Sequence, residues 1–146
     1  MKPPPNLELE RAVLAGLMLD PPALEGLQLA REDFGDAAHR LIFRAIAGAY
    51  PDIDLRTIEA HLEKRGQLEK VGGLGYLAGL DMSLPDLGRV PLYAQTLREL
   101  RVRREVASRA RLLAVTAEEP GETTARDLLD LAGADLVATE KLLATG

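Results

Sequence analysis

The sequence predicts an all-α protein, with a small helical globular head followed by a long helical hairpin. Apolar side chains recur at helical spacing within residues 38–49, and one helical pattern runs from about Pro91 to Glu118 with no Gly or Pro in its interior. Apolar residues make up 47% of the 146 residues but aromatic residues only 3%, so the core must be built from Leu, Ala, Val and Ile. This composition favours helices that pack through aliphatic side chains.

The first two helices have clear starts and stops. Asn6 is a good N-cap, because its side chain can accept a hydrogen bond from an N–H group of the following turn. It ends an extended, proline-rich leader at residues 3–5 and begins a helix expected over residues 7–19. An Asp-Pro-Pro sequence at residues 20–22 stops this helix, and a short second helix is expected over residues 23–29.

Three further helices complete the predicted head. The third has its core face at positions i, i+3, i+4, i+7, i+8 and i+11 from Ala38 to Ala49. Asp54 can cap a fourth helix, and Gly66 is its expected stop signal. A fifth helix is expected over residues 74–80.

The predicted hairpin has a long first helix and a shorter second one. The first ends near Glu118, and the second is capped by Thr123 or Thr124 and continues through Leu143. Gly133 lies inside the last helix, where Gly costs about 1 kcal/mol relative to Ala. We expect the head to cover residues 1–85 and the hairpin residues 86–146.

The composition excludes several classes of protein. Without Cys, the chain has no disulfide framework and no thiolate metal site. No apolar stretch approaches the ~20 residues needed to span a bilayer, and no signal-peptide pattern is present. We therefore expect a cytoplasmic protein without membrane contact. The net charge of −5 disfavours broad affinity for nucleic-acid phosphates.

No residue pattern indicates catalysis or a bound cofactor. The G-x-x-x-x-G-K-[ST] loop that holds nucleotide phosphates is absent, so this chain alone should not hydrolyse ATP. Residues 73–78 fit a short form of the dinucleotide fingerprint, but the predicted fold has no strand before them. We interpret His39 and His61 as structural, and we expect no catalytic residue, no cofactor and no metal.

The first hairpin helix carries two displaced apolar stripes, which indicate two neighbours. One stripe contains Tyr93, Leu97 and Leu100 and is flanked by Arg101 and Arg104. The second, displaced stripe contains Val102, Val106, Ala110 and Leu113. We predict that Tyr93, Leu97 and Leu100 mediate self-association, because a second copy of the chain could cover an exposed apolar stripe.

Arginines concentrate on the same helix. We predict that Arg98, Arg101 and Arg104 dock a partner protein. A solvated face is the simpler alternative. Local contact with single-stranded nucleic acid is a weaker one, because Tyr93 is the only aromatic residue near this cluster.

Three sequence blocks follow one another in a distinctive order. They are PPPNLELERAVLAGLMLD at residues 3–20, EDFGDAAHRLIFRAI at 32–46 and IDLRTIEAHLEKRGQLEKVGGLGYLAGL at 53–80. In this order they resemble the N-terminal domain of the DnaB family of bacterial replicative DNA helicases. The segment YAQTLRE at residues 93–99 is similar to the first hairpin helix of that family. The resemblance covers about the first 110 residues well and the rest loosely.

The resemblance implies a scaffold. In such helicases the N-terminal domains pair through their hairpins, three dimers form a collar above a ring of ATPase domains, and the collar receives primase. For this chain it implies dimers or a trimer of dimers, with primase and a helicase loader as partners and only weak contact with single-stranded DNA. The full-length parent would be an ATP-dependent DNA helicase, and the linker to its ATPase domain would begin near residue 146.

Two other functions remain open. One is a stand-alone adaptor or inhibitor of helicase assembly with the same fold. The other is a metabolic enzyme that uses the glycine motif at residues 73–78 with a nucleotide cofactor.

Overall fold

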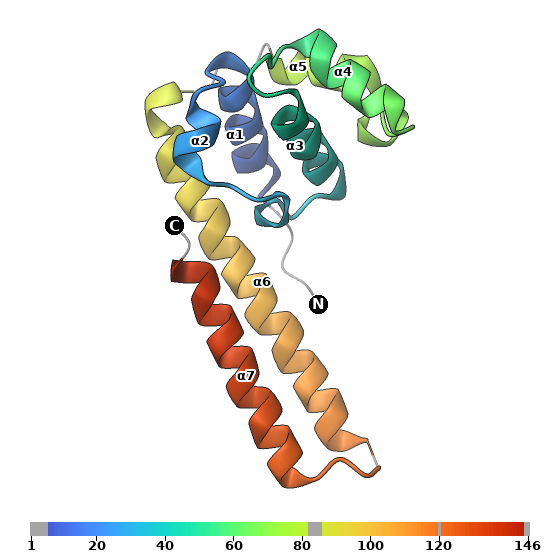
Figure 1. The fold of residues 1–146 in the computed structure, drawn as a ribbon, viewed down its shortest axis with the longest axis vertical. Helices are drawn as coiled ribbons and strands as arrows, with labels where there is room; N and C mark the ends of the chain where they lie inside the picture. The colour runs from blue at the N-terminus through green and yellow to red at the C-terminus, as the bar shows by residue number, and fades with distance from the viewer. Residues whose placement is uncertain (1–5, 82–85, 120, 145–146) are drawn as a thin grey trace. The chain divides into compact units, whose positions relative to one another are not determined.

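A computed structural model describes residues 6–81, 86–119 and 121–144 of the chain. Every regular element in these ranges is a helix, which confirms the all-α fold class with its helical head and helical hairpin (Figure 1). The proline leader, and residue 85 where the head is expected to end, lie outside the described residues. The α-helices are α1 (Leu7–Leu19), α2 (Ala23–Leu27), α3 (Ala37–Ala49), α4 (Leu55–Lys64), α5 (Gly73–Asp81), α6 (Val90–Glu118) and α7 (Ala125–Ala144), and the short 3-10 helices are η1 (Arg31–Asp33), η2 (Glu69–Val71) and η3 (Leu87–Arg89).

The chain divides into two compact units, and the boundary along the chain lies between Leu97 and Arg98. We call the unit before this point the head and the unit after it the hairpin. The division lies inside α6, because Val90, Ala94 and Leu97 of its first turns belong to the core of the head. Sequence periodicity predicts the helix but not this division, since α6 continues as one helix from Val90 to Glu118.

Local sequence signals set most helix ends in the head. Asn6 and Asp54 each accept a hydrogen bond from the backbone N–H three residues further on, at 3.1 and 2.8 Å. Gly66 follows α4 with a φ of 66°, a left-handed conformation that glycine adopts without strain. The second helix ends at Leu27, earlier than the expected residue 29, because Gln28 takes a left-handed φ of 50°.

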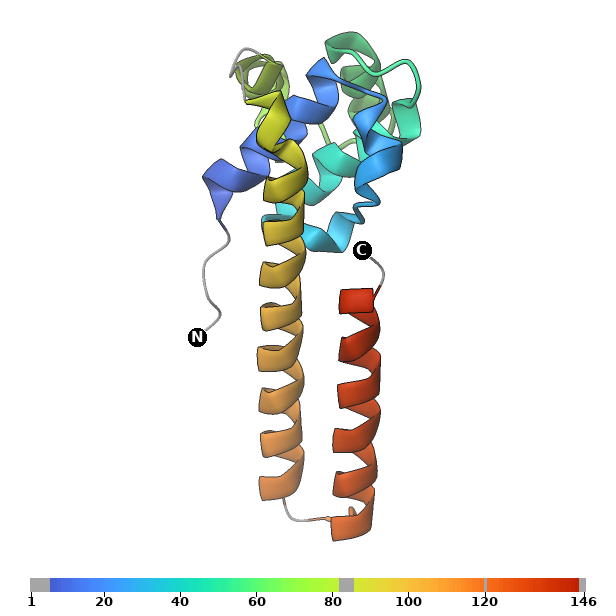
Figure 2. The ribbon, with the colours of Figure 1, turned by 90° about the vertical axis from the view of Figure 1, so that its left-hand side faces the viewer.

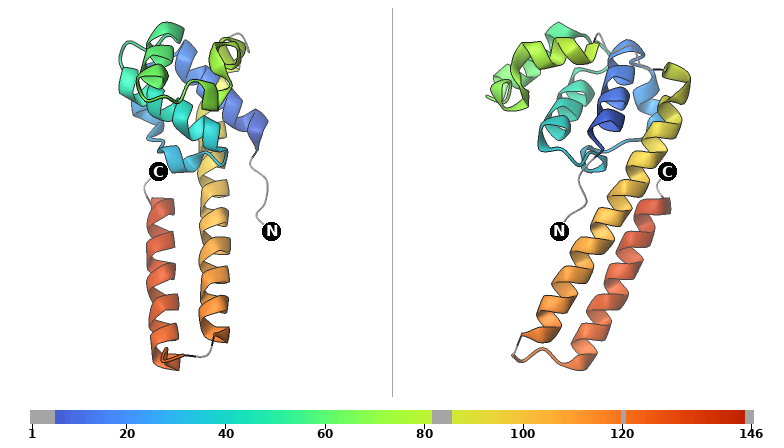
Figure 3. Two further views of the ribbon diagram at one scale, coloured as in Figure 1. Left: turned by 90° about the vertical axis from the view of Figure 1, so that its right-hand side faces the viewer. Right: turned by 180° about the vertical axis from the view of Figure 1, so that it is seen from behind.

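The head has an apolar core to which α1, α3, α4 and α5 all contribute. Figure 3 (right) shows how these helices are arranged. The predicted face of α3 is buried at Ile42, Ala45 and Ile46, while Ala38 and Leu41 at its edge are half-buried. The largest apolar side chains that are fully buried are Phe34, Leu14, Leu17, Ile42, Ile46, Ile58, Leu62, Leu77 and Leu97.

The first turn of α6 packs tightly against α1 at Gly16. A Cβ atom built on Gly16 would lie 2.7 Å from Cγ2 of Val90. Val90 is 3% exposed, and its branched side chain has few rotamers, so it has little room to move. Gly16 therefore allows this close approach.

We expect Gly16→Ala to destabilise the head by ~1–3 kcal/mol, because overpacking outweighs the higher helix propensity of Ala. Chemical denaturation measures this change. Gly79→Ala in α5 is the matched control: a Cβ there has nothing within 4 Å, and the variant should be more stable by up to ~1 kcal/mol. Equal stabilities of the two variants would contradict the close contact.

The hairpin consists of the remainder of α6 and of α7, which lie side by side and run antiparallel (Figures 1 and 2). Thr124 caps α7, because its Oγ1 accepts from the Asp127 N–H while Asp127 Oδ2 accepts from the Thr124 N–H, both at 3.1 Å. The helix continues through Gly133 to Ala144. Within the described ranges, every helix is too short or too polar to cross a membrane.

Candidate protein-interaction surface

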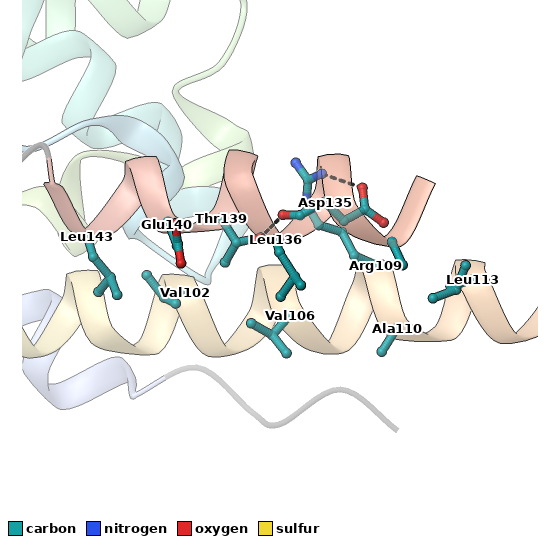
Figure 4. Close-up of a pocket in the computed structure, with 11 residues that line it drawn as sticks. Val102, Val106, Arg109, Ala110, Leu113, Asp135, Leu136, Thr139, Glu140 and Leu143 are labelled. Carbon is teal, nitrogen blue, oxygen red and sulfur yellow. Dashed lines mark hydrogen bonds and ion pairs between the residues drawn. The ribbon is translucent and has the colours of Figure 1, made fainter. Parts of the chain in front are cut away.

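An apolar groove of about 410 Å³ lies between the two arms of the hairpin (Figure 4). Residues three, four or seven positions apart share one face of a helix, so each arm lines the groove with one continuous stripe. The lining residues are Val102, Val106, Arg109, Ala110 and Leu113 from α6, and Ala132, Asp135, Leu136, Thr139, Glu140 and Leu143 from α7.

Several apolar side chains at this groove are widely exposed. Val106 is 52% exposed, Leu136 is 68% and Leu143 is 55%. Leu129, which is 62% exposed, lies on the same face of α7, since Leu129, Leu136 and Leu143 are spaced seven residues apart. Among the hairpin side chains that the structure describes, Thr139 is the one that is buried. A heptad-spaced row of exposed leucines is typical of a helix that packs against further helices.

An ion pair between Arg109 and Asp135 joins the two arms within this groove. Nη1 of Arg109 donates to Oδ1 of Asp135 at 2.8 Å (Figure 4). Nε of Arg109 also donates to Oε2 of Glu105 on its own helix, at 3.4 Å. The hydrogen bond to Asp135 raises the pKa of Arg109 above its usual value, so the guanidinium stays charged. The side chains of Arg109 and Asp135 are 36% and 22% exposed. A partner that fills the groove would therefore cover a charged pair together with the leucines.

The three residues predicted to mediate self-association lie in different surroundings. Leu97 is 1% exposed and belongs to the core of the head. Tyr93 is partly buried against the same core, and Leu100 is half-buried in the hairpin. They do not form one exposed stripe, because the head already covers Leu97. Self-association through this stripe stays a prediction. In the second stripe Val106 and Ala110 are exposed, while Val102 and Leu113 are half-buried.

The three arginines predicted to dock a partner lie on successive turns of α6. Arg98, Arg101 and Arg104 are each half-buried, and each already takes part in an interaction. Arg103 and Arg111 of the same helix are exposed. The docking role stays a prediction.

A buried polar network links three helices of the head. The carboxylate of Glu10 accepts from the N–H groups of Gly35 at 2.7 Å and Asp36 at 3.2 Å, and from Nδ1 of His39 at 2.8 Å. Nε2 of His39 lies 2.6 Å from the hydroxyl of Tyr76. Because a carboxylate only accepts, Nδ1 carries the proton, and in a neutral imidazole Nε2 then accepts from Tyr76. The network holds α1, α3 and α5 together, which gives His39 a structural role.

The glycine motif at residues 73–78 forms the start of α5. Gly72 and Gly73 have φ values of 103° and 73°, and they turn the chain from η2 into this helix. Within the described residues no strand adjoins the motif, whereas the dinucleotide fingerprint follows a strand. Among residues 6–81, 86–119 and 121–144, no three His, Asp or Glu side chains lie close enough together to hold a metal ion.

Known replicative helicases are similar to this chain in sequence. The family described as DnaB-like helicase N terminal domain matches residues 2–99. The replicative DNA helicase DnaB of Treponema pallidum is 36% identical over 155 aligned residues, which cover 97% of this chain and 35% of that protein. The DnaB of Geobacillus stearothermophilus is 38% identical over 117 residues, which cover 77% of this chain and 26% of that protein. This chain thus spans about a third of these relatives or less.

Two solved structures share the fold. The N-terminal domain of DnaB helicase from Mycobacterium tuberculosis superposes with a TM-score of 0.84 at 27% identity, covering 93% of this chain and 99% of that one. A structure described as a DnaB-like replicative helicase and its interactions with primase has a TM-score of 0.75 at 22% identity, over 92% of this chain and 31% of that one. The second shows likeness of fold alone. Since the family match covers most of the chain and agrees with the fold, this protein belongs to the family of DnaB-like helicase N-terminal domains.

Proposed function

We propose that this chain is a scaffold for DNA replication, the N-terminal collar domain of a replicative DNA helicase. In this proposal it brings helicase copies together and docks primase or a helicase loader. Unwinding driven by ATP belongs to the remainder of the full-length helicase, which acts in the cytoplasm. Family membership supports the role in replication. The exposed leucine row beside the groove of the hairpin is the observation that carries self-association.

The hairpin has little to stabilise it as a separate pair of helices. Helices in proteins are stabilised mainly by burying an apolar face, and the described aliphatic side chains of this hairpin are at most half-buried. Full burial of one Leu side chain contributes ~1.5–3 kcal/mol. A partner that covers the leucine row would supply the burial that the hairpin lacks.

A second copy of the chain is the partner that fits best. In a two-fold dimer the same groove is covered on both copies, so the leucine row of each hairpin is buried by one set of contacts. A specific interface of standard size hides ~800 Å² on each partner. We propose that hairpins pair in this way and that three dimers can close into a ring.

Sedimentation velocity over a dilution series tests this proposal. We expect a reversible equilibrium in which dimers or larger symmetric assemblies form as the concentration rises. A protein that sediments as a monomer at every concentration would contradict self-association.

We expect charge reversal at Arg98, Arg101 and Arg104 to weaken binding of primase or of the helicase loader by ~10-fold or more. Acidic groups of a partner that docks on these arginines would then face negative charges. Calorimetric titration with each purified partner measures the effect. The control reverses Arg103 and Arg111, which are exposed on the same helix. Circular dichroism checks that both variants remain helical. If the triple variant binds both partners as tightly as wild type, these arginines do not dock them.

A further inference from the structure

The apolar groove of the hairpin contains an ion pair that joins its two arms, and Glu140 is the other charged residue that lines it. Arg109 lies between Val106 and Leu113 on α6, and Asp135 lies beside Leu136 on α7. Their 2.8 Å contact crosses from one arm to the other (Figure 4). Any helix that docks into the groove must pass over this pair.

The leucine row beside the groove repeats itself along the helix. Leu129, Leu136 and Leu143 are spaced seven residues apart, which corresponds to a rise of about 10 Å along the axis. A docked hairpin that slides by one repeat still places leucine against leucine. Apolar contacts alone therefore define the register of docking poorly.

The charged pair is not repeated in this way. Covering Arg109 and Asp135 removes water from both charges, and this is tolerated only where their mutual contact persists and polar groups satisfy them. After a slide by one repeat, the charged pair would face the leucine row of the second copy. The leucines themselves would keep their apolar contacts. A single polar position within an apolar seam is known to fix the register of helix pairing in this manner, at some cost in stability.

We infer that the Arg109–Asp135 pair determines the register in which a second copy of the chain docks into the groove. This inference rests on the proposed self-association. The pair acts as a specificity determinant and adds little to the strength of association. Glu105, which also contacts Arg109 at 3.4 Å, keeps the guanidinium oriented along α6.

The test replaces the pair by apolar residues and measures distances between the two copies. The chain contains no Cys, so Arg111→Cys introduces a unique site for a spin label on an exposed position of α6 outside the groove. Pulsed electron spin resonance then reports the distances between labels in the assembled protein. The variant is Arg109→Met with Asp135→Leu, and both new residues favour helix formation.

The matched control alters an ion pair that lies within α7. Arg126 and Asp130 are 4.0 Å apart and exposed, with side chains 77% and 69% accessible. Replacing them by Gln and Asn removes two charges without touching the groove. This control should keep the distance distribution of the otherwise unaltered, labelled chain.

We expect the apolar variant to associate at least as tightly as wild type but with a distance distribution about twofold broader or split into several peaks. An unchanged narrow distribution would overturn the inference, and so would a variant that stays helical but no longer associates, since the pair would then supply affinity. If the labelled wild type gives no distance between copies, self-association itself fails. The experiment therefore separates failure of the inference from failure of the proposed function.

Discussion

Leu136→Asp is expected to convert the self-associated protein to a monomer. Leu136 is 68% exposed at the middle of the leucine row, where a second hairpin would bury it. The substitution removes ~1.5–3 kcal/mol of apolar burial on each copy and places a charge where water would be excluded. We expect the dissociation constant to rise at least ~100-fold, which sedimentation equilibrium can measure.

The control for this variant is Leu112→Asp. Leu112 is 62% exposed on α6 and does not line the groove, so the two substitutions add the same charge at sites of similar exposure. Leu112→Asp should leave the dissociation constant within a factor of about three of wild type. If Leu112→Asp dissociates the protein and Leu136→Asp does not, the interface lies on the other side of the hairpin.

Glu10→Ala should have the largest effect on the stability of the head. The substitution leaves the N–H groups of Gly35 and Asp36 and Nδ1 of His39 without their acceptor in a site where Glu10 is fully buried. Each buried donor that loses its partner costs ~1–3 kcal/mol. We expect a loss of ~3–5 kcal/mol, a large part of the ~5–15 kcal/mol that stabilises a typical domain. Urea denaturation monitored by circular dichroism measures this loss.

Two comparisons separate the network from the effect of charge on α1. Glu8→Ala removes an exposed carboxylate from the same first turn and should cost less than ~1 kcal/mol. Glu10→Gln keeps one acceptor oxygen and should fall between Glu8→Ala and Glu10→Ala. A cost for Glu10→Ala no greater than that for Glu8→Ala would mean that the network does not hold the head together.

Features that depend on neighbouring residues could be predicted from the sequence. The caps at Asn6 and Asp54 and the left-handed Gly66 depend on residues within one turn of the helix end. The core face of α3 follows from the helical period, and Ile42 and Ile46 are fully buried as the spacing predicts.

Features that depend on distant residues could not be predicted in this way. Periodicity shows that a face of α6 is covered but not which residues cover it. Leu97 is buried in the core of the head, whereas the sequence pattern placed it in a stripe for self-association. The seven-residue spacing of Leu129, Leu136 and Leu143 is the signal in the sequence for the exposed leucine row of α7. No local pattern pairs Arg109 with Asp135, which are 26 positions apart.

The role of Glu10 shows the same limit. Its place in the first turn of α1 predicts a favourable interaction with the helix dipole. In the fold it instead holds the loop before α3 and orients His39, because residues 25 and more positions away bring their donors to it.

Hydrogen exchange measured over a range of protein concentrations tests the central claim most directly, because it locates the surface that a second copy covers. We expect amides of residues 102–113 and 129–143 to exchange more slowly as the concentration rises, since burial of the groove suppresses local opening of these helices. Amides of α3 in the head should be unaffected. Exchange in the hairpin that does not depend on concentration would contradict the claim that its groove is the self-association surface.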